Sequence, residues 1–209
     1  MTAFFPQLTV QNEEVLRIAG LPNNSVEVSL IRRGIRPESV ADTRSVLAEN
    51  GAPFSIEEMI EDTFRPKHQY PTPFKPGRFG NGHWAVYYSA ASVATCAKEL
   101  AYHLDGEDLS GRYFVLVSCR FDGIVLDLER HQEQYPDLVS DTSAGYPFCQ
   151  QIAQTARSST SGLHAPSARH TAGRYIPVFT RASLSQARRV HRGRFVKDKN
   201  DSLDFQQSP

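Results

Sequence analysis

Arginine, glutamate and serine side chains between residues 65 and 167 offer two complementary kinds of chemistry. Arg65 and Arg78 flank a segment rich in proline and glycine, and a guanidinium group binds phosphates or carboxylates through forked hydrogen bonds. Glu99 lies in an otherwise apolar stretch, on the same face of a predicted helix as Thr95. Such a carboxylate is either paired and functional or simply lies at the edge of the helix. The alternative interpretation of the two arginines is that they are ordinary solvated surface residues.

A tyrosine and a serine add hydrogen-bonding and stacking capacity to this set. Tyr87 and Tyr88 are neighbours in a predicted strand, so one faces the core and the other faces a cleft or solvent. Ser167 lies in a turn-like segment, residues 162–169, that is rich in hydrogen-bond donors. Its simplest interpretation is an ordinary loop serine. Residue types alone therefore leave open whether these side chains form one site.

Several well-known catalytic patterns are missing from the sequence. No Walker A loop is present, and the glycines of residues 77–82 precede a predicted strand, whereas a dinucleotide-binding fingerprint follows one. No His-Glu-x-x-His or Cys-x-x-Cys spacing occurs, so we expect no metal site. The Gly-x-Ser-x-Gly pattern of many hydrolases is also missing.

Composition places the chain among globular proteins. Its 209 residues carry 23 basic and 23 acidic groups, which argues against a basic nucleic-acid coat protein, and no apolar run is long enough to span a membrane. The first residues lack a secretory signal pattern. Three cysteines, an odd number without paired spacing, favour a reducing compartment. We therefore expect a cytoplasmic protein.

The first 64 residues are predicted to form a mainly helical, acidic extension. The pattern predicts a helix over Asn12–Ala19 that stops at Gly20. A second helix is predicted from Pro37 to Asn50, and a third begins at the capping-box residue Ser55 and runs through Phe64. Residues 26–31 alternate weakly and favour a short strand.

Residues 65–182 are predicted to form an α+β core with a mostly antiparallel sheet and surrounding helices. The prolines and glycines of residues 65–82 exclude regular structure there, and long irregular segments are often functional. Helices are expected at 93–104, capped by Ser92, and at 147–157. A loop is expected at 158–164. Strands are expected at 83–89, 113–120, 124–128, 176–180 and 189–197, with a hairpin turn at Phe121–Gly123 joining the second and third of them.

Taken in order, these features resemble the RES domain family, which is named for its Arg, Glu and Ser. The resemblance spans about residues 64–182. The matching pieces are a glycine–arginine loop, a strand with tyrosine, a helix ending in glutamate and a Pro-Ser-x-Arg segment: Gly77–Phe79, Val86–Tyr88, Thr95–Glu99 and Ser161–Arg169. Phe79 stands where the family has Trp, and the family's Asn is displaced to Asn81. An upstream family arginine falls on Arg65.

The resemblance implies a split, ADP-ribosyltransferase-like sheet and an NAD-consuming, toxin-like enzyme. Such enzymes break the nicotinamide–ribose bond with phosphate or water, or transfer ADP-ribose to a protein. NAD would be the substrate, inorganic phosphate a potential co-substrate, and no metal would be needed. An Xre-type antitoxin is the implied partner, and direct contact with nucleic acid or membrane is not expected.

Residue roles follow from the resemblance in the same way. Glu99 would stabilise the positive charge that builds on the ribose, and Arg65 and Arg78 would complete the catalytic set by binding phosphates. Substrate contacts would come from the aromatic, small and polar residues of the matching segments: Tyr88, Ser167, Gly77, Asn81 and Arg169.

The last segment, residues 183–209, is basic, with four arginines between 188 and 194. Such a cluster either binds nucleic acid or an acidic partner, or it is a solvated edge strand whose arginines protect the edge of a sheet. A non-enzymatic alternative is therefore a partner-binding module whose cleft has lost activity.

Overall fold

The computed structural model describes residues 7–20, 34–40, 42–43, 56–67, 71–109, 112–199 and 202–208. Seven strands form one sheet in the order β1-β2-β5-β4-β3-β6-β7, with a further pairing between β1 and β3. The strands are β1 (Gln7–Gly20), β2 (Tyr87–Ala90), β3 (Phe114–Asp127), β4 (Gly162–Pro166), β5 (Arg174–Val178), β6 (Leu184–Lys197) and β7 (Leu203–Ser208). All pairs are antiparallel except β3 with β4. The predicted α+β class with a mostly antiparallel sheet is confirmed.

Three α-helices of the described ranges pack on this sheet: α3 (Ile56–Phe64), α4 (Val93–Leu104) and α5 (Tyr146–Ala156). Each was predicted from local signals, and the Ser92 hydroxyl caps α4 by accepting the Thr95 backbone N–H. Short 3-10 turns occur at Pro37–Ser39, Glu129–His131, Pro136–Val139, Ser143–Gly145 and Arg181–Ser183. None of the described helices is long and apolar enough to cross a membrane.

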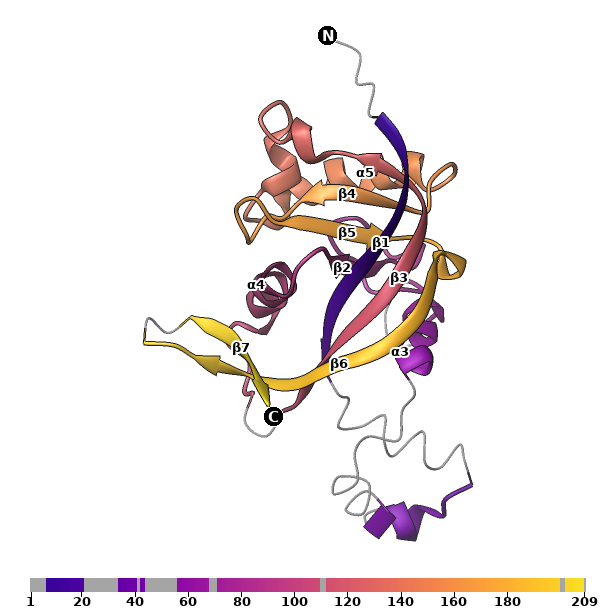
Figure 1. Cartoon of the computed structure of the whole chain (residues 1–209), viewed down its shortest axis with the longest axis vertical. Coiled ribbons are helices and arrows are strands. Elements are labelled where there is room, and N and C mark those ends of the chain that lie inside the picture. The colour runs from indigo at the N-terminus through magenta and orange to yellow at the C-terminus, as the bar shows by residue number, and fades with distance from the viewer. Residues whose placement is uncertain are drawn as a thin grey trace.

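The predicted helix over Asn12–Ala19 is wrong, because this segment belongs to strand β1. β1 pairs with β3 over fourteen residues, from Gln7 opposite Asp127 to Gly20 opposite Phe114. Pairing and packing in the sheet outweigh the modest helix propensity of its Glu, Leu and Arg residues. Val15 is fully buried against the centre of the sheet. β1, β3 and β6 run side by side as the longest strands (Figure 1).

Two further corrections concern glycines read as turn or loop signals. Phe121–Gly123 is not a hairpin turn, because β3 continues through it while paired with β1. A Cβ on Gly123 would lie 2.5 Å from the Ser161 hydroxyl oxygen, so this glycine serves close packing. The predicted loop at 158–164 ends early, since strand β4 begins at Gly162.

Some predictions fall partly or wholly outside the described residues. The strand predicted at 26–31 and the Ser55 cap lie outside them. Of the helix predicted from Pro37 to Asn50, the described part is a 3-10 turn followed by helical Val40, Asp42 and Thr43. The predicted strand at 83–89 is shorter in the structure, where only residues 87–90 pair as β2.

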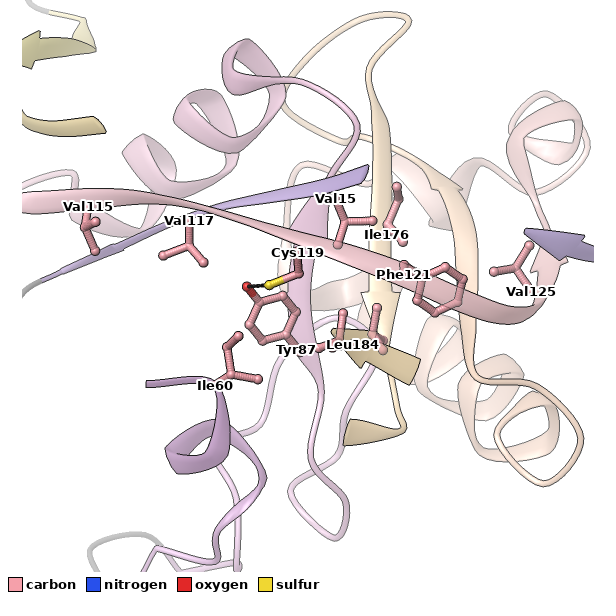
Figure 2. Close-up of a cluster of buried hydrophobic side chains, with 11 residues drawn as sticks. Val15, Ile60, Tyr87, Val115, Val117, Cys119, Phe121, Val125, Ile176 and Leu184 are labelled. Atoms are coloured by element: carbon pink, nitrogen blue, oxygen red, sulfur yellow. Dashed lines mark hydrogen bonds between the residues drawn. The ribbon is translucent and has the colours of Figure 1, made fainter. Parts of the chain in front are cut away.

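The two faces of β3 show how the layers are built. Its odd-numbered residues, including Val117 and Phe121, join a core that α3 covers through Ile60 (Figure 2). Its even-numbered residues face the other way and pack against α4 and α5 through residues such as Leu116 and Leu126. The sheet is therefore covered by helices on both faces.

β1 and β2 separate almost as soon as they meet. Their single pair is Leu16 opposite Ala90. Arg17 and Ile18 on one strand and Ser89 on the other would continue an antiparallel ladder, but they line a cavity instead. The divergence of these two strands opens the site described next.

Candidate functional site

A cavity of about 420 Å³ lies where β1, β2, α3 and α4 meet. This volume lies within the range of small-molecule and cofactor sites. Five of the eight residues that the sequence singles out line it: Gly77, Arg78, Tyr88, Glu99 and Arg169. The structure thus brings together residues that are up to 92 positions apart in the chain.

Arg78 is held at the tip of a tight turn. The Gly77 N–H donates to the Gly80 carbonyl at 2.7 Å, and the amide of Gln150 on α5 donates to the Gly77 carbonyl at 2.9 Å. The buried Phe79 ring fixes the other side of the turn in the core that contains α5. The position of Arg78 is therefore set by two elements, the turn and α5.

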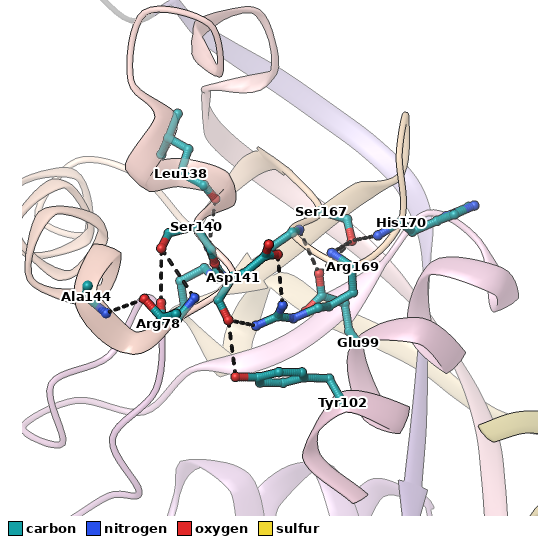
Figure 3. A network of polar contacts seen from close by, with 12 residues as sticks. Arg78, Glu99, Tyr102, Leu138, Ser140, Asp141, Ala144, Ser167, Arg169 and His170 are labelled. Atoms are coloured by element: carbon teal, nitrogen blue, oxygen red, sulfur yellow. Dashed lines mark hydrogen bonds and ion pairs between the residues drawn. The ribbon is translucent and has the colours of Figure 1, made fainter. Parts of the chain in front are cut away.

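The Arg78 side chain is buried, and main-chain oxygens bind it. Its Nη1 donates to the Leu138 carbonyl at 2.9 Å and its Nη2 to the Ser140 carbonyl at 2.8 Å (Figure 3). No carboxylate pairs with it among the described residues, so its positive charge is not neutralised locally. Two of its five N–H donors are used in these bonds and a further one contacts the Cys149 side chain, which leaves donors for an anion.

Tyr88 explains why Gly77 has no side chain. The Tyr88 hydroxyl accepts the Phe79 N–H at 3.1 Å, and its ring stacks on Tyr175 with centroids 5.7 Å apart. A Cβ on Gly77 would lie 2.7 Å from that hydroxyl oxygen. Burial raises the pKa of Tyr88 above its ordinary value, so the phenol stays protonated at neutral pH and keeps a hydrogen to donate.

Glu99 is a buried carboxylate with one oxygen fixed. Its Oε1 accepts the Ser167 hydroxyl at 2.6 Å and the Ala168 N–H at 3.1 Å. No hydrogen bond to Oε2 occurs within the described part of the chain. The carboxylate therefore has a set orientation and one oxygen left for other contacts.

Ser167 is fully engaged within the protein. While its hydroxyl donates to Glu99, its oxygen accepts the N–H groups of Arg169 at 3.2 Å and His170 at 3.0 Å. One donor and two acceptor positions are all that a hydroxyl has. The family resemblance implies a contact between Ser167 and substrate, and in the structure the Ser167 hydroxyl orients Glu99.

Arg169 forms one wall together with Tyr102. Its guanidinium lies 3.4 Å from the centre of the Tyr102 ring, and it binds the Asp141 carboxylate at 3.1 Å and the Asp141 carbonyl at 2.7 Å. The Tyr102 hydroxyl donates to the same carbonyl at 3.3 Å. This cluster links α4 to the loop that also binds Arg78 (Figure 3).

Besides Ser167, two predicted residues lie outside the cavity lining. Arg65 is exposed just after α3. The Asn81 side chain accepts the His83 backbone N–H at 3.1 Å and so stabilises its own loop. The structure does not bring either residue to the group around Glu99.

Sequence reasoning missed several cationic residues of the cavity. Arg17 comes from β1, where its guanidinium stacks 4.6 Å from the Tyr87 ring centre and its Nη1 donates to the Thr63 hydroxyl at 3.3 Å. Nothing local marked this arginine once its segment was read as a helix. Lys67 and Lys75 also line the cavity. They lie in the irregular segment that the sequence marks as functional, so their charge was the available signal.

Other titratable groups that line the cavity limit the reactions it can support. Burial raises the pKa of the Cys96 thiol to about 12, so no thiolate nucleophile forms there at neutral pH. Partial desolvation lowers the pKa of His103, with Glu99 opposing this shift and Lys75 among the cations that add to it. Within the described ranges, no group of three or more His, Cys, Asp or Glu residues could hold a metal ion.

The geometry and the order of the residues agree with one known family. A model of the RES domain matches residues 53–198, which is well over half of the chain and includes α3 and β6. A search of curated proteins finds no match. On the strength of the family match, the chain belongs to the RES domain family.

Proposed function

We propose that the protein consumes NAD by breaking the bond between nicotinamide and ribose. RES domains are associated with NAD-processing, toxin-like enzymes. The observation that carries the proposal is the oriented carboxylate of Glu99 in a cavity rich in cations and aromatic rings, where the other lining carboxylate, Asp62, is paired with Lys67. This combination suits a substrate that is anionic at its phosphates and becomes cationic at one sugar carbon.

Bond cleavage needs one carboxylate rather than two. Nicotinamide leaves with the electron pair of the C1′–N bond, which turns the cationic pyridinium into a neutral molecule, so no acid has to protonate it. The ribose left behind carries oxocarbenium character, and the free oxygen of Glu99 stabilises that charge. Phosphate or water then attacks C1′ and loses a proton. The products are nicotinamide and an ADP-ribose derivative.

The cations would bind the pyrophosphate. Arg78 supplies a guanidinium with unused donors, and Arg17 and Lys75 reach the cavity from other elements. The rings of Tyr88 and Tyr102 offer surfaces for the nicotinamide and adenine bases. The divergence of β1 and β2 would correspond to the split sheet of ADP-ribosyltransferases.

The family also implies a setting for this activity. An enzyme that depletes NAD in its own cell needs an inhibitor, so we propose an Xre-type antitoxin as the partner and the cytoplasm as the location. Transfer of ADP-ribose to a protein target is the alternative outcome of the same cleavage. A partner-binding module without activity is the non-enzymatic alternative.

The test measures NAD loss by the purified protein with and without phosphate. We expect Glu99→Gln to lower the rate by about a hundredfold or more, because a neutral amide cannot stabilise the sugar cation. Glu107→Gln is the matched control, since Glu107 pairs with Arg112 at the exposed end of α4. Phosphate dependence identifies phosphorolysis, and labelled NAD reveals any protein acceptor. Equal rates for Glu99→Gln and the native protein would rule the mechanism out.

A further inference from the structure

The turn at residues 167–173 is fastened to α4 at two points one helical turn apart. Glu99 forms the first point, through the Ser167 hydroxyl and the Ala168 N–H. Thr95 forms the second, because its hydroxyl oxygen lies 2.9 Å from Nδ1 of His170. Residues four apart lie on one face of a helix, so both contacts hold the same turn to the same face.

Thr95 is itself locked in place before it meets the turn. Its side chain is almost fully buried, and its hydroxyl oxygen also lies 2.8 Å from the Ser92 hydroxyl, which caps α4. The start of the helix therefore fixes the Thr95 hydroxyl, and His170 is placed against a rigid partner. Nothing in the proposed chemistry uses Thr95 or His170 directly.

Gly173 allows the approach of the turn to α4. A Cβ at this position would lie 2.7 Å from the Thr95 hydroxyl oxygen and 2.7 Å from Nδ1 of His170. The backbone closes tightly here, since the Gly173 N–H donates to the His170 carbonyl and the Ser167 N–H donates to the Gly173 carbonyl, both at 2.8 Å. The contact between Thr95 and His170 thus depends on a position without a side chain.

We propose that Thr95 and His170 are positioning residues for Glu99. Their hydrogen bond sets the turn against α4 so that the Ser167 hydroxyl and the Ala168 N–H meet Oε1. The turn is held together internally, because the Ser167 oxygen accepts the N–H groups of Arg169 and His170. The catalytic consequence rests on the proposed function of Glu99, whereas the structural one does not.

Loss of the hydrogen bond between Thr95 and His170 is expected to misplace the Glu99 carboxylate while leaving the rest of the cavity, and therefore NAD binding, unchanged. Glu99 acts in the transition state, so kcat falls while KM for NAD stays near its native value. A displacement of a reacting group by about 1 Å costs on the order of a hundredfold in rate. We therefore expect kcat to fall about 10- to 100-fold.

Three variants separate the hydrogen bond from its surroundings. Thr95→Val keeps the shape and removes the hydroxyl, and Thr95→Ser restores it. Gly173→Ala removes no polar atom but forces Thr95 and His170 apart. Thr155→Val on α5 is the matched control, because its hydroxyl binds only the preceding turn of its own helix and is exposed.

Two measurements are made on each variant of the full chain, with its melting temperature as a check on folding. The first is kcat and KM for NAD. The second is hydrogen exchange of the amides of residues 168–170. We expect lower kcat and faster exchange in Thr95→Val and Gly173→Ala, with near-native values in Thr95→Ser and Thr155→Val.

The outcomes distinguish this inference from the function on which it rests. Native kcat in folded Thr95→Val and Gly173→Ala, while Glu99→Gln is inactive, would overturn the positioning role alone. If the native protein does not consume NAD, the proposed function fails, and amide exchange decides the structural role. Unchanged exchange in both variants would then overturn it.

Discussion

Two walls of the cavity differ in how their residues could be found. The wall made by the 77–80 turn, α4 and the turn after β4 lies inside the range that matches the RES domain, and its Arg78 and Glu99 belong to recognisable local patterns. The wall made by β1 lies outside that range, yet it contributes Arg17. The site is therefore assembled from a segment with a family signature and a segment without one.

This difference shows that the first strand is part of the core that forms the cavity. β1 pairs with the whole length of β3 and places Val15 in the central core. If β1 only covered the outside of the core, its removal would leave the walls of the cavity intact. Here its loss would remove one wall and one cation.

The largest expected effect tests whether the protein needs β1 in order to fold. Val15→Asp places a carboxylate at a position with no solvent exposure, and a buried unpaired charge costs more than about 4 kcal/mol. We expect this variant not to fold, as judged by circular dichroism and solubility. Val10→Asp on the same strand is the control, because Val10 is 78% exposed. A native melting temperature for Val15→Asp would show that β1 is dispensable.

The next largest expected effect concerns the other wall of the cavity, which contains the 77–80 turn. Gly77→Ala drives a methyl group against the Tyr88 hydroxyl, and overpacking of this kind costs about 1–3 kcal/mol. We expect a lower melting temperature and weaker NAD binding, because the Arg78 turn is displaced. Gly20→Ala serves for comparison, since a Cβ there meets Phe114 at an ordinary 3.6 Å. Equal stability of the two variants would contradict the close packing of Tyr88.

A smaller effect compares two arginines directly. Arg17→Gln removes a cavity cation, and a hydrogen bond to a charged group contributes about 1.5–3 kcal/mol. We expect the Kd for NAD, measured by calorimetry, to rise about tenfold. Arg65→Gln should leave the Kd unchanged, because Arg65 is exposed and outside the lining. The reverse result would return the phosphate-binding role to Arg65.

The smallest expected effect concerns the pH dependence of folding stability. The pKa of His103 is lowered in the folded protein, first by desolvation, so the native state binds its proton less readily than the unfolded state does. Stability from this group is present above the unfolded pKa of about 6.5 and is lost as the pH falls through the lower folded value. Thermal melts across this window should show less pH dependence in His103→Phe. The change is small because solvent screens this exposed side chain.

The elements predicted correctly are those with local signals. The Ser92 cap, the start of α5 near Pro147 and the proline-rich irregular segment each depend on a few neighbouring residues. The errors at residues 12–19 and 121–123 share another cause. Their structure is decided by strands that pair with them from about a hundred positions away in the chain, or by residues that pack tightly on them. No local pattern records such partners.

The residues of the site show the same contrast between local motifs and long-range pairing. Glu99, Arg78 and Tyr88 lie together as predicted, since each belongs to an ordered motif. Arg17 could not be found because its position depends on long-range pairing. The hydrogen bonds of Ser167 to Glu99 and to neighbouring backbone groups could not be predicted, because they become visible only in three dimensions.

Carbonyl oxygens rather than a carboxylate hold the Arg78 guanidinium, and this has a practical consequence for enzymology. A cation with no carboxylate partner in the described part of the chain attracts whichever small anion the medium supplies, so sulfate or chloride would compete with NAD, the proposed substrate. Apparent affinities will then depend on the buffer salt, with divalent anions inhibiting more strongly than chloride. Kinetic constants for this protein should be compared only at matched ionic composition.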